Sequence, residues 1–374
     1  MKKRTMFGRI LPMFLSAILF ISCLTSCEMT SLLQSESDST AESGEEQNSE
    51  SLSNSDENSS SEIPEEDEPS LLFFHPLTGL TCTSEQSLTR PMAFIIGNTG
   101  AGLPQYGTSY ADILVETPEY DGSTKLTLIT THYAECAKIG SIRAALPYHT
   151  EIAEFFGATL VHAGTADGSH TSSITTRNLL SADSTASAFY RESGRLSPHN
   201  IFTELSRLTN GLRTNGITTS LATAESVFSF AEEKETISFS GQIATHIRLD
   251  YSGSQRTEFR YQADTGLYVR YQNGIAMTDA LTNTALTARN ILILYTDSTI
   301  SETAESSSLT IDCSGGSGVY AADGSYIPIL WQKSSDGGLV LTRTNGELLS
   351  LYTGVTHIEM MKSSLKNSVA LDCE

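Results

Sequence analysis

Residues 70–215 alternate short apolar runs with a segment of helical periodicity. Apolar positions from 142 to 156 recur at helical spacing and predict a helix that begins at Ser141 or at Pro147. A Ser-Pro pair predicts a second helix start, with the helix over 199–208. Runs of β-branched and aliphatic residues predict buried strands at 91–96, 113–115, 126–131 and 159–162. The alternation predicts an N-terminal α/β domain with a mixed sheet.

Residues 236–374 follow another pattern, in which apolar and polar positions alternate with period two. Asn273-Gly274 and Asn345-Gly346 are turn signals between such runs. Strands are predicted at 245–250, 257–261, 267–271, 290–295, 326–332, 338–343, 347–352 and 355–360. We predict a mainly antiparallel β C-terminal domain, sandwich-like or barrel-like. An Ala/Glu-rich helix over 221–233 is expected in a connecting segment, 216–235. The predicted fold class is α+β.

Residues 1–27 have the layout of a secretory signal. After a basic start, the stretch from Ile10 to Leu24 is almost wholly apolar but shorter than the ~20 residues that a spanning helix needs. Leu24-Thr25-Ser26-Cys27 resembles the bacterial lipobox, in which a lipidated cysteine follows a leucine and two small residues. Cys23 is the competing match, and an ordinary signal with incidental cysteines is the alternative. We predict a lipid on Cys27 that holds the protein to the outer face of the cytoplasmic membrane.

Residues 28–69 contain 14 Asp and Glu and no Lys or Arg, so they cannot bury enough apolar surface to offset chain entropy. We predict a disordered acidic tether here. The whole chain has a net charge of −21, which argues against a nucleic-acid-binding surface and against docking on anionic lipid through charge.

Cysteines beyond the tether show no metal-binding pattern. Cys82, Cys136, Cys313 and Cys373 form no CxxC and no Cys/His spacing, and three disulfide pairings are open to them. The sequence predicts no cofactor and no metal.

Polar residues at the two predicted helix starts define a candidate anion site. Ser141 and Arg143 would combine free backbone N–H groups with a guanidinium. His199 and Asn200 lie at the second predicted start, where the imidazole adds a titratable group.

Two further candidates follow predicted strands. His162 precedes a Gly-containing turn, and Glu116 lies just after an apolar run. If these strand ends share one edge of the sheet, Glu116, Arg143, His162 and His199 converge on a cleft. The simpler alternatives are that Arg143 pairs with a surface carboxylate, that His162 is a hydrogen-bonded core residue and that His199 is solvated.

The order and spacing of several motifs carry a family resemblance. They are His75-Pro76-Leu77-Thr78-Gly79-Leu80, Arg90-Pro91, Gln105 to Asp112, Gly140-Ser141-Ile142-Arg143, Pro147-Tyr148, His162-Ala163-Gly164 and Pro198-His199-Asn200. In these motifs the chain resembles the YerB-like lipoproteins, which carry a DUF3048 N- and C-terminal domain pair of unknown function. The resemblance covers most of 72–365 and implies a lipoprotein, but no reaction. Because Arg90 belongs to the Arg90-Pro91 motif, we add it to the candidate ligand-binding residues.

The chain departs from the family pattern at four positions. Leu146 and Lys125 replace arginines, Ser141 replaces a proline and Met277 replaces a histidine. If the replaced residues bind a ligand in the family, this chain has a weaker or altered site.

Two functions compete. The first is a binding or accessory protein for an anionic envelope component, such as a peptidoglycan fragment or a phosphorylated polymer. The alternative is a cell-wall or phosphoester hydrolase with Glu116 as general acid or base, His162 or His199 as its partner and Arg143 as the anion clamp. No GxSxG or HExxH signature is present, so we favour binding. A structural partner of another envelope complex is a third possibility.

Overall fold

The computed structural model describes residues 72–164, 179–231, 239, 242–302 and 307–372. The predicted signal with Cys23 and Cys27, the predicted tether and Cys373 lie outside these residues. The chain divides into two units, 1–66 and 67–374, and all the helices and strands given below belong to the second unit. In the described ranges, no helix is long and apolar enough to cross a membrane.

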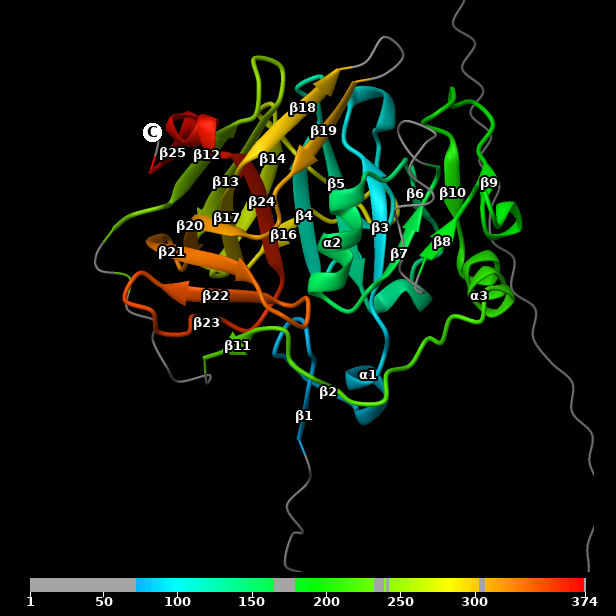
Figure 1. Ribbon diagram of the computed structural model, residues 1–374, viewed down its shortest axis with the longest axis horizontal. Helices are drawn as coiled ribbons and strands as arrows, with labels where there is room; N and C mark the ends of the chain where they lie inside the picture. Colours follow the sequence, from blue (N-terminus) through cyan, green and yellow to red (C-terminus); the bar gives the residue numbers. More distant parts are fainter. Residues whose placement is uncertain (1–71, 165–178, 232–238, 240–241, 303–306, 373–374) are drawn as a thin grey trace, which may run out of the picture. The chain divides into compact units, whose positions relative to one another are not determined.

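A mixed sheet of ten strands takes its members from distant parts of the chain (Figure 1). In spatial order they are β22 (Leu339–Arg343), β21 (Ser325–Lys333), β20 (Gly315–Ala322), β17 (Asn290–Thr296), β24 (Thr356–Lys362), β4 (Ile113–Pro118), β5 (Thr124–Thr130), β3 (Met92–Gly97), β7 (Thr159–His162) and β8 (Leu179–Ser181). β24 is parallel to both β17 and β4, and β7 is parallel to β3 and β8, whereas the other pairs are antiparallel. A mixed sheet in a β-rich fold is present as predicted, but it is not confined to residues 70–215: five of its ten strands come from 290–362, which were predicted to form a separate, mainly antiparallel domain. The proposed domain boundaries remain a prediction.

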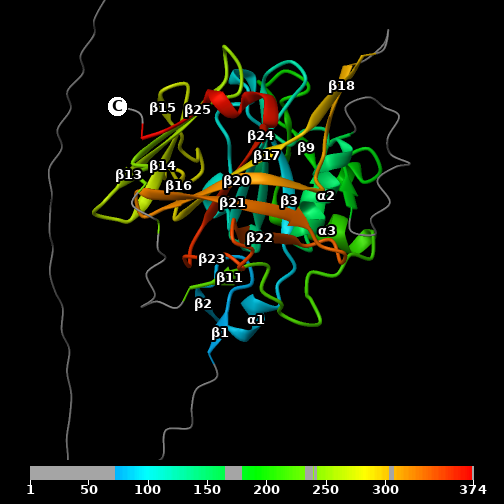
Figure 2. The same cartoon turned by 60° about the vertical axis from the view of Figure 1, so that its left-hand side comes forward.

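A second, antiparallel sheet packs beside the first. Its strands are β15 (Ile275–Ala276), β14 (Leu267–Gln272), β13 (Arg256–Gln262), β12 (His246–Asp250) and β25 (Val369–Leu371), with β16 (Thr287–Ala288) paired to β14. Figure 2 shows β13 to β16 on the opposite side of the view from helices α2 (Pro147–Phe155) and α3 (Leu205–Thr214). The predicted turn at Asn273-Gly274 joins β14 to β15, with φ of 51° and 80° at the two residues.

Short elements complete the described chain. They include the helix α1 (Ser84–Ser87) and the 3₁₀ turns η1 (Gly100–Gly102), η2 (Thr108–Tyr110), η3 (His132–Ala134), η5 (Ala186–Ala188) and η6 (Ser363–Ser368). Three strand pairs are β1 (Phe73–Phe74) with β2 (Thr81–Cys82), β11 (Ser229–Phe230) with β23 (Ser350–Leu351), and β18 (Ser298–Glu302) with β19 (Ser307–Ile311). A small sheet consists of β6 (Ile139–Gly140), β10 (Ile201–Thr203) and β9 (Tyr190–Arg191).

Both faces of the large sheet are buried, because alternate residues of each central strand enter different cores. On β3, Ala93 and Ile95 pack in the core that includes α2, while Phe94 and Ile96 pack in the core that includes α3. On β17, the second face packs instead against the antiparallel sheet. This double burial explains why the central strands are continuous apolar runs.

One predicted helix begins later than expected, and another is absent from the described residues. Within 199–208, residues Ile201–Thr203 form β10 between β6 and β9, and α3 begins only at Leu205. Residues 221–231 contain no helix, and their backbone bonds other segments: Leu221 N donates to Leu88 O and Val227 N to Pro76 O. Tertiary pairing outweighs the local helix propensity of these segments. The third predicted helix begins at Pro147, not at Ser141.

A glycine-rich stretch, 315–318, forms a strand that the pattern did not predict. A Cβ at Gly316 would lie 2.4 Å from Tyr295 O, and one at Gly318 would lie 2.6 Å from Ile293 O. The glycines therefore permit the close approach of β20 to β17.

Candidate functional site

The structure brings two of the predicted residues into contact. Arg143 Nη1 lies 2.9 Å from His199 Nδ1. A guanidinium only donates, so the imidazole nitrogen accepts and the ring is neutral. Burial, with Arg143 and Arg195 nearby, lowers the pKa of His199. Burial also lowers the pKa of Arg143.

Backbone hydrogen bonds hold Arg143 between two strands of the large sheet. Its N–H donates to Ile95 O at 2.8 Å, and its carbonyl accepts from Ala163 N at 2.9 Å. Gly97, at the end of β3, leaves room for the side chain, since a Cβ there would lie 3.2 Å from Arg143 Cγ. The guanidinium is thus presented beside the ends of β3 and β7.

Ser141 lies on the same side of Gly97. The added Cβ at Gly97 would lie 3.1 Å from Ser141 Oγ. This hydroxyl is buried and has no hydrogen-bond partner among the described residues. The site therefore combines a guanidinium, a neutral imidazole and a hydroxyl, although Ser141 follows β6 and lies outside the helix that we predicted to begin there.

Two other candidates bond elsewhere. Asn200 Oδ1 accepts from Arg191 Nη1 at 2.8 Å, on an exposed part of the chain. Arg90 Nε donates to Thr218 O at 2.9 Å, which ties the start of β3 to the segment after α3. Neither side chain has a hydrogen bond to Arg143 or His199 among the described contacts.

His162 ends β7 with a buried side chain. Its Nδ1 donates to Gly164 O at 2.7 Å, and its Nε2 is buried with no partner in the described part of the chain. Burial lowers the pKa of His162, so the ring is neutral. Its observed bond is to backbone and not to the Arg143–His199 pair.

Glu116 lies inside the protein on β4, with no exposed surface. It accepts from Arg270 Nη2 at 2.5 Å and from Thr257 Oγ1 at 2.6 Å. Burial alone would raise the pKa of Glu116, but Arg270 and these hydrogen bonds hold it below its usual value. The four residues expected to converge are thus joined by contact only at Arg143 and His199.

Sequence reasoning missed a third group, His75, Asp112 and His132. One ligand atom from each lies within 4.8 Å of the others. The hydrogen bond to Asp112 raises the pKa of His132 to about 9, against the opposite effect of burial. The three residues are tens of positions apart and fit no metal-binding spacing, so only the fold reveals the group.

Comparisons with known proteins place the chain in a family. Residues 77–218 match the N-terminal domain, and residues 247–358 the C-terminal domain, of the protein of unknown function DUF3048. The chain belongs to this two-domain family, as the sequence motifs predicted.

Two comparisons concern a Bacillus subtilis protein. The chain is 24% identical over 292 residues to the "Putative lipoprotein YerB" of strain 168, which covers 76% of this chain and 85% of the relative. The crystal structure of YerB matches with a TM-score of 0.71 and 22% identity, over 80% of this chain and all of that one. The second likeness shows a shared fold.

Proposed function

We propose that this protein is an extracytoplasmic lipoprotein that binds an anionic component of the cell envelope at Arg143 and His199. The observation that carries the proposal is the half-buried guanidinium, whose hydrogen-bonding partner is a neutral ring. No carboxylate of the described residues lies within ion-pair distance of Arg143, on which Glu119 acts only at longer range and while paired with Lys125, in contrast to Arg270, which bonds two carboxylates. A phosphate or carboxylate would supply the missing negative charge.

Binding is favoured over hydrolysis because of Glu116. In the hydrolase alternative this carboxyl transfers a proton to or from a substrate. Here it is enclosed and ion-paired with Arg270. A recognition role needs only the donors that Arg143, His199 and Ser141 supply.

The ligand-binding proposal is tested with matched arginine variants. We expect Arg143→Gln to weaken co-sedimentation of the purified protein with isolated cell walls by about 10-fold or more, because a charge-assisted hydrogen bond contributes ~1.5–3 kcal/mol. Arg213→Gln removes the same charge at an exposed position of α3 and should leave the affinity within about twofold. Equal binding by all three proteins, or equal loss in both variants, contradicts the proposal.

The membrane anchor is tested separately by labelling cells with an alkyne fatty acid. Support comes from Leu24-Thr25-Ser26-Cys27 and from the relative named as a lipoprotein. We expect label on the protein, no label after Cys27→Ala, and full label after Cys23→Ala. Label at an unchanged level after Cys27→Ala contradicts acylation at this cysteine.

A further inference from the structure

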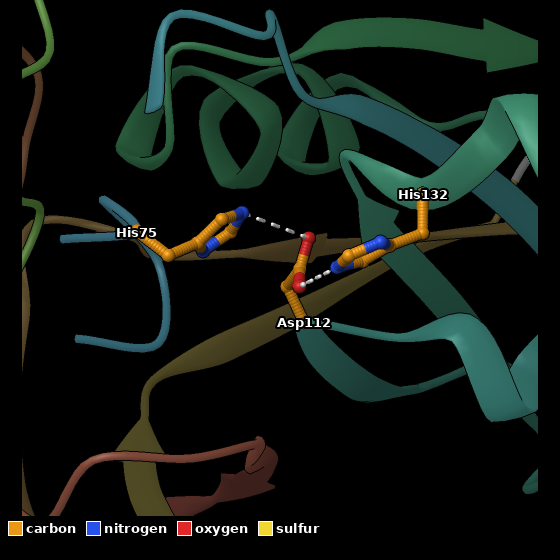
Figure 3. Close-up of side chains that lie close together, drawn as sticks. All are labelled: His75, Asp112 and His132. Atoms are coloured by element: carbon orange, nitrogen blue, oxygen red, sulfur yellow. Dashed lines mark ion pairs between the residues drawn. The ribbon is translucent and has the colours of Figure 1, made fainter. Parts of the chain in front are cut away.

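Three loops meet at the end of the large sheet where β4 begins. His75 follows β1, Asp112 immediately precedes β4, and His132 opens η3 just after β5. Asp112 N donates to Ile129 O at 3.0 Å, and His132 N donates to Thr130 Oγ1 at 2.9 Å, so both residues are fixed to β5. Figure 3 shows the Asp112 carboxylate between the two imidazole rings.

The separations suit a common ligated ion. Asp112 Oδ1 lies 3.3 Å from His132 Nε2, and Asp112 Oδ2 lies 3.9 Å from His75 Nε2. Zinc bonds of about 2.0–2.1 Å at a tetrahedral angle place two ligand atoms about 3.3 Å apart. The first pair has that separation, and all three ligand atoms lie within 4.8 Å of one another.

Surrounding groups orient the carboxylate and both imidazoles. His75 Nε2 lies 2.8 Å from Thr131 Oγ1, a hydrogen bond that a metal ion bound to this nitrogen would replace. Asp112 Oδ2 accepts from Thr131 N at 2.7 Å and from Thr131 Oγ1 at 2.9 Å. On the far side of its ring, His132 Nδ1 lies 3.1 Å from Glu135 Oε1. A carboxylate on the second nitrogen of a histidine is the usual outer partner of a metal-ligating imidazole, where it fixes the tautomer.

The group of His75, Asp112 and His132 is accessible to solvent on one side only, the side of His132. The side chains of His75 and Asp112 are 5% and 4% exposed, and that of His132 is 36% exposed. A buried pair with one accessible ligand allows an ion to enter from solvent. It also leaves room for water or another molecule in the fourth position, as in zinc sites with three protein ligands.

We propose that His75, Asp112 and His132 form a site for a divalent transition metal, with Zn²⁺ as the best match to two imidazoles and one carboxylate. Bound there, the ion links the loop after β1 to the central strands of the sheet.

This site is separate from the one in the proposed function. Met92 pairs with Thr130 at one end of β3, and Gly97 pairs with Lys125 at the other. The metal ligands lie by Thr130, and Arg143 lies by Gly97. At ~3.3 Å per residue the two sites are roughly 16 Å apart, so either proposal can fail alone.

The test measures binding of Zn²⁺ and Co²⁺ to the purified, chelator-treated protein. We expect one ion per chain by calorimetry, and the visible absorption of low-symmetry Co²⁺. His132→Ala and Asp112→Asn should weaken binding at least 100-fold, because each removes one of three ligands. His132→Ala changes the most exposed ligand, and circular dichroism verifies that both variants fold.

The matched control is His246→Ala. His246 Nε2 lies 2.9 Å from Glu258 Oε2 on the antiparallel sheet, so it is another partly exposed histidine beside a carboxylate. This variant should bind Zn²⁺ within twofold of the unchanged protein. The proposal is overturned if neither ion binds, in which case the group is a hydrogen-bonded ion pair only, or if His132→Ala and Asp112→Asn bind both ions as tightly as the control.

Discussion

Arg270 lies between two carboxyl groups, Glu116 of β4 and Glu359 of β24, which are register partners on neighbouring parallel strands. All three side chains are fully buried. One guanidinium cannot neutralise two carboxylates, and burial together with repulsion from Glu116 raises the pKa of Glu359 well above its usual value. Tyr251 completes the group by donating its hydroxyl to Glu359 Oε2 at 2.8 Å.

Removing Arg270 should therefore be severely destabilising. We expect Arg270→Met to lower the free energy of unfolding by about 3–5 kcal/mol, because it leaves a buried carboxylate without its partner. Arg260→Met is the control. Arg260 is 47% exposed and pairs with Glu258, so its loss should cost less than about 1 kcal/mol. Urea unfolding measures both, and equal losses would contradict this account of the buried group.

Individual site residues were only partly predictable from the sequence. Arg143 and His199 were identified and do meet, but not at helix starts, because Arg143 lies in a loop between strands and His199 precedes β10. Glu116 was predicted at a strand end, and its partner is 154 positions away on another sheet. No local pattern connects a carboxylate to an arginine at that distance.

At the scale of elements, the apolar central strands were the most predictable. β3, β4, β5 and β7 form where runs of β-branched and aliphatic residues predicted them. Each is buried on both faces, so hydrophobicity alone marks its position. The alternating strands β12 to β14 were equally visible, because one face of each meets a core.

Elements fixed by distant partners were not predictable. β10 has three residues and exists because β6 and β9 flank it. The segment after residue 221 was predicted as a helix from composition, yet it extends along Leu88 and Pro76. The hydrogen bonds of such short elements come from segments that are distant in the sequence, and local propensity contains no information about those segments.

At the scale of the whole molecule, enclosed histidines should govern the response to mild acid. His149 and His357 are fully buried, and burial lowers the pKa of each well below 6.5. Below pH 6.5 the unfolded chain binds protons at these positions and the folded chain does not, so stability falls as pH falls. Each contributes up to about 1.4 kcal/mol per pH unit.

Other titratable groups change the stability in the opposite direction, or in a different range of pH. Glu359, whose pKa is raised, keeps its proton when folded and opposes the trend, whereas His162 and His199, whose pKa values are lowered, act in the same direction as His149 and His357. In the metal-free protein, His132, with a pKa of about 9, contributes stability that is complete below pH 6.5 and is lost as pH rises toward 9. The net prediction is lower stability at pH 5.5 than at pH 6.5.

Urea unfolding at the two pH values measures this difference. We expect His357→Leu to reduce the loss by about 1 kcal/mol, since it removes one of the two enclosed rings. A free energy of unfolding that is unchanged between pH 6.5 and 5.5, or a loss unaffected by His357→Leu, would show that other groups control the acid response.

The order of strands in the large sheet has a consequence for biosynthesis. β4 pairs on one side with β24, which begins at Thr356, more than two hundred residues later in the chain. Until that late segment has been synthesised, the middle of the sheet has an edge with unpaired amide groups, and such an edge is prone to pair with other chains. A polypeptide that terminates before β24 would leave this edge of β4 unpaired. Synthesis of β24 is therefore needed to complete the large sheet.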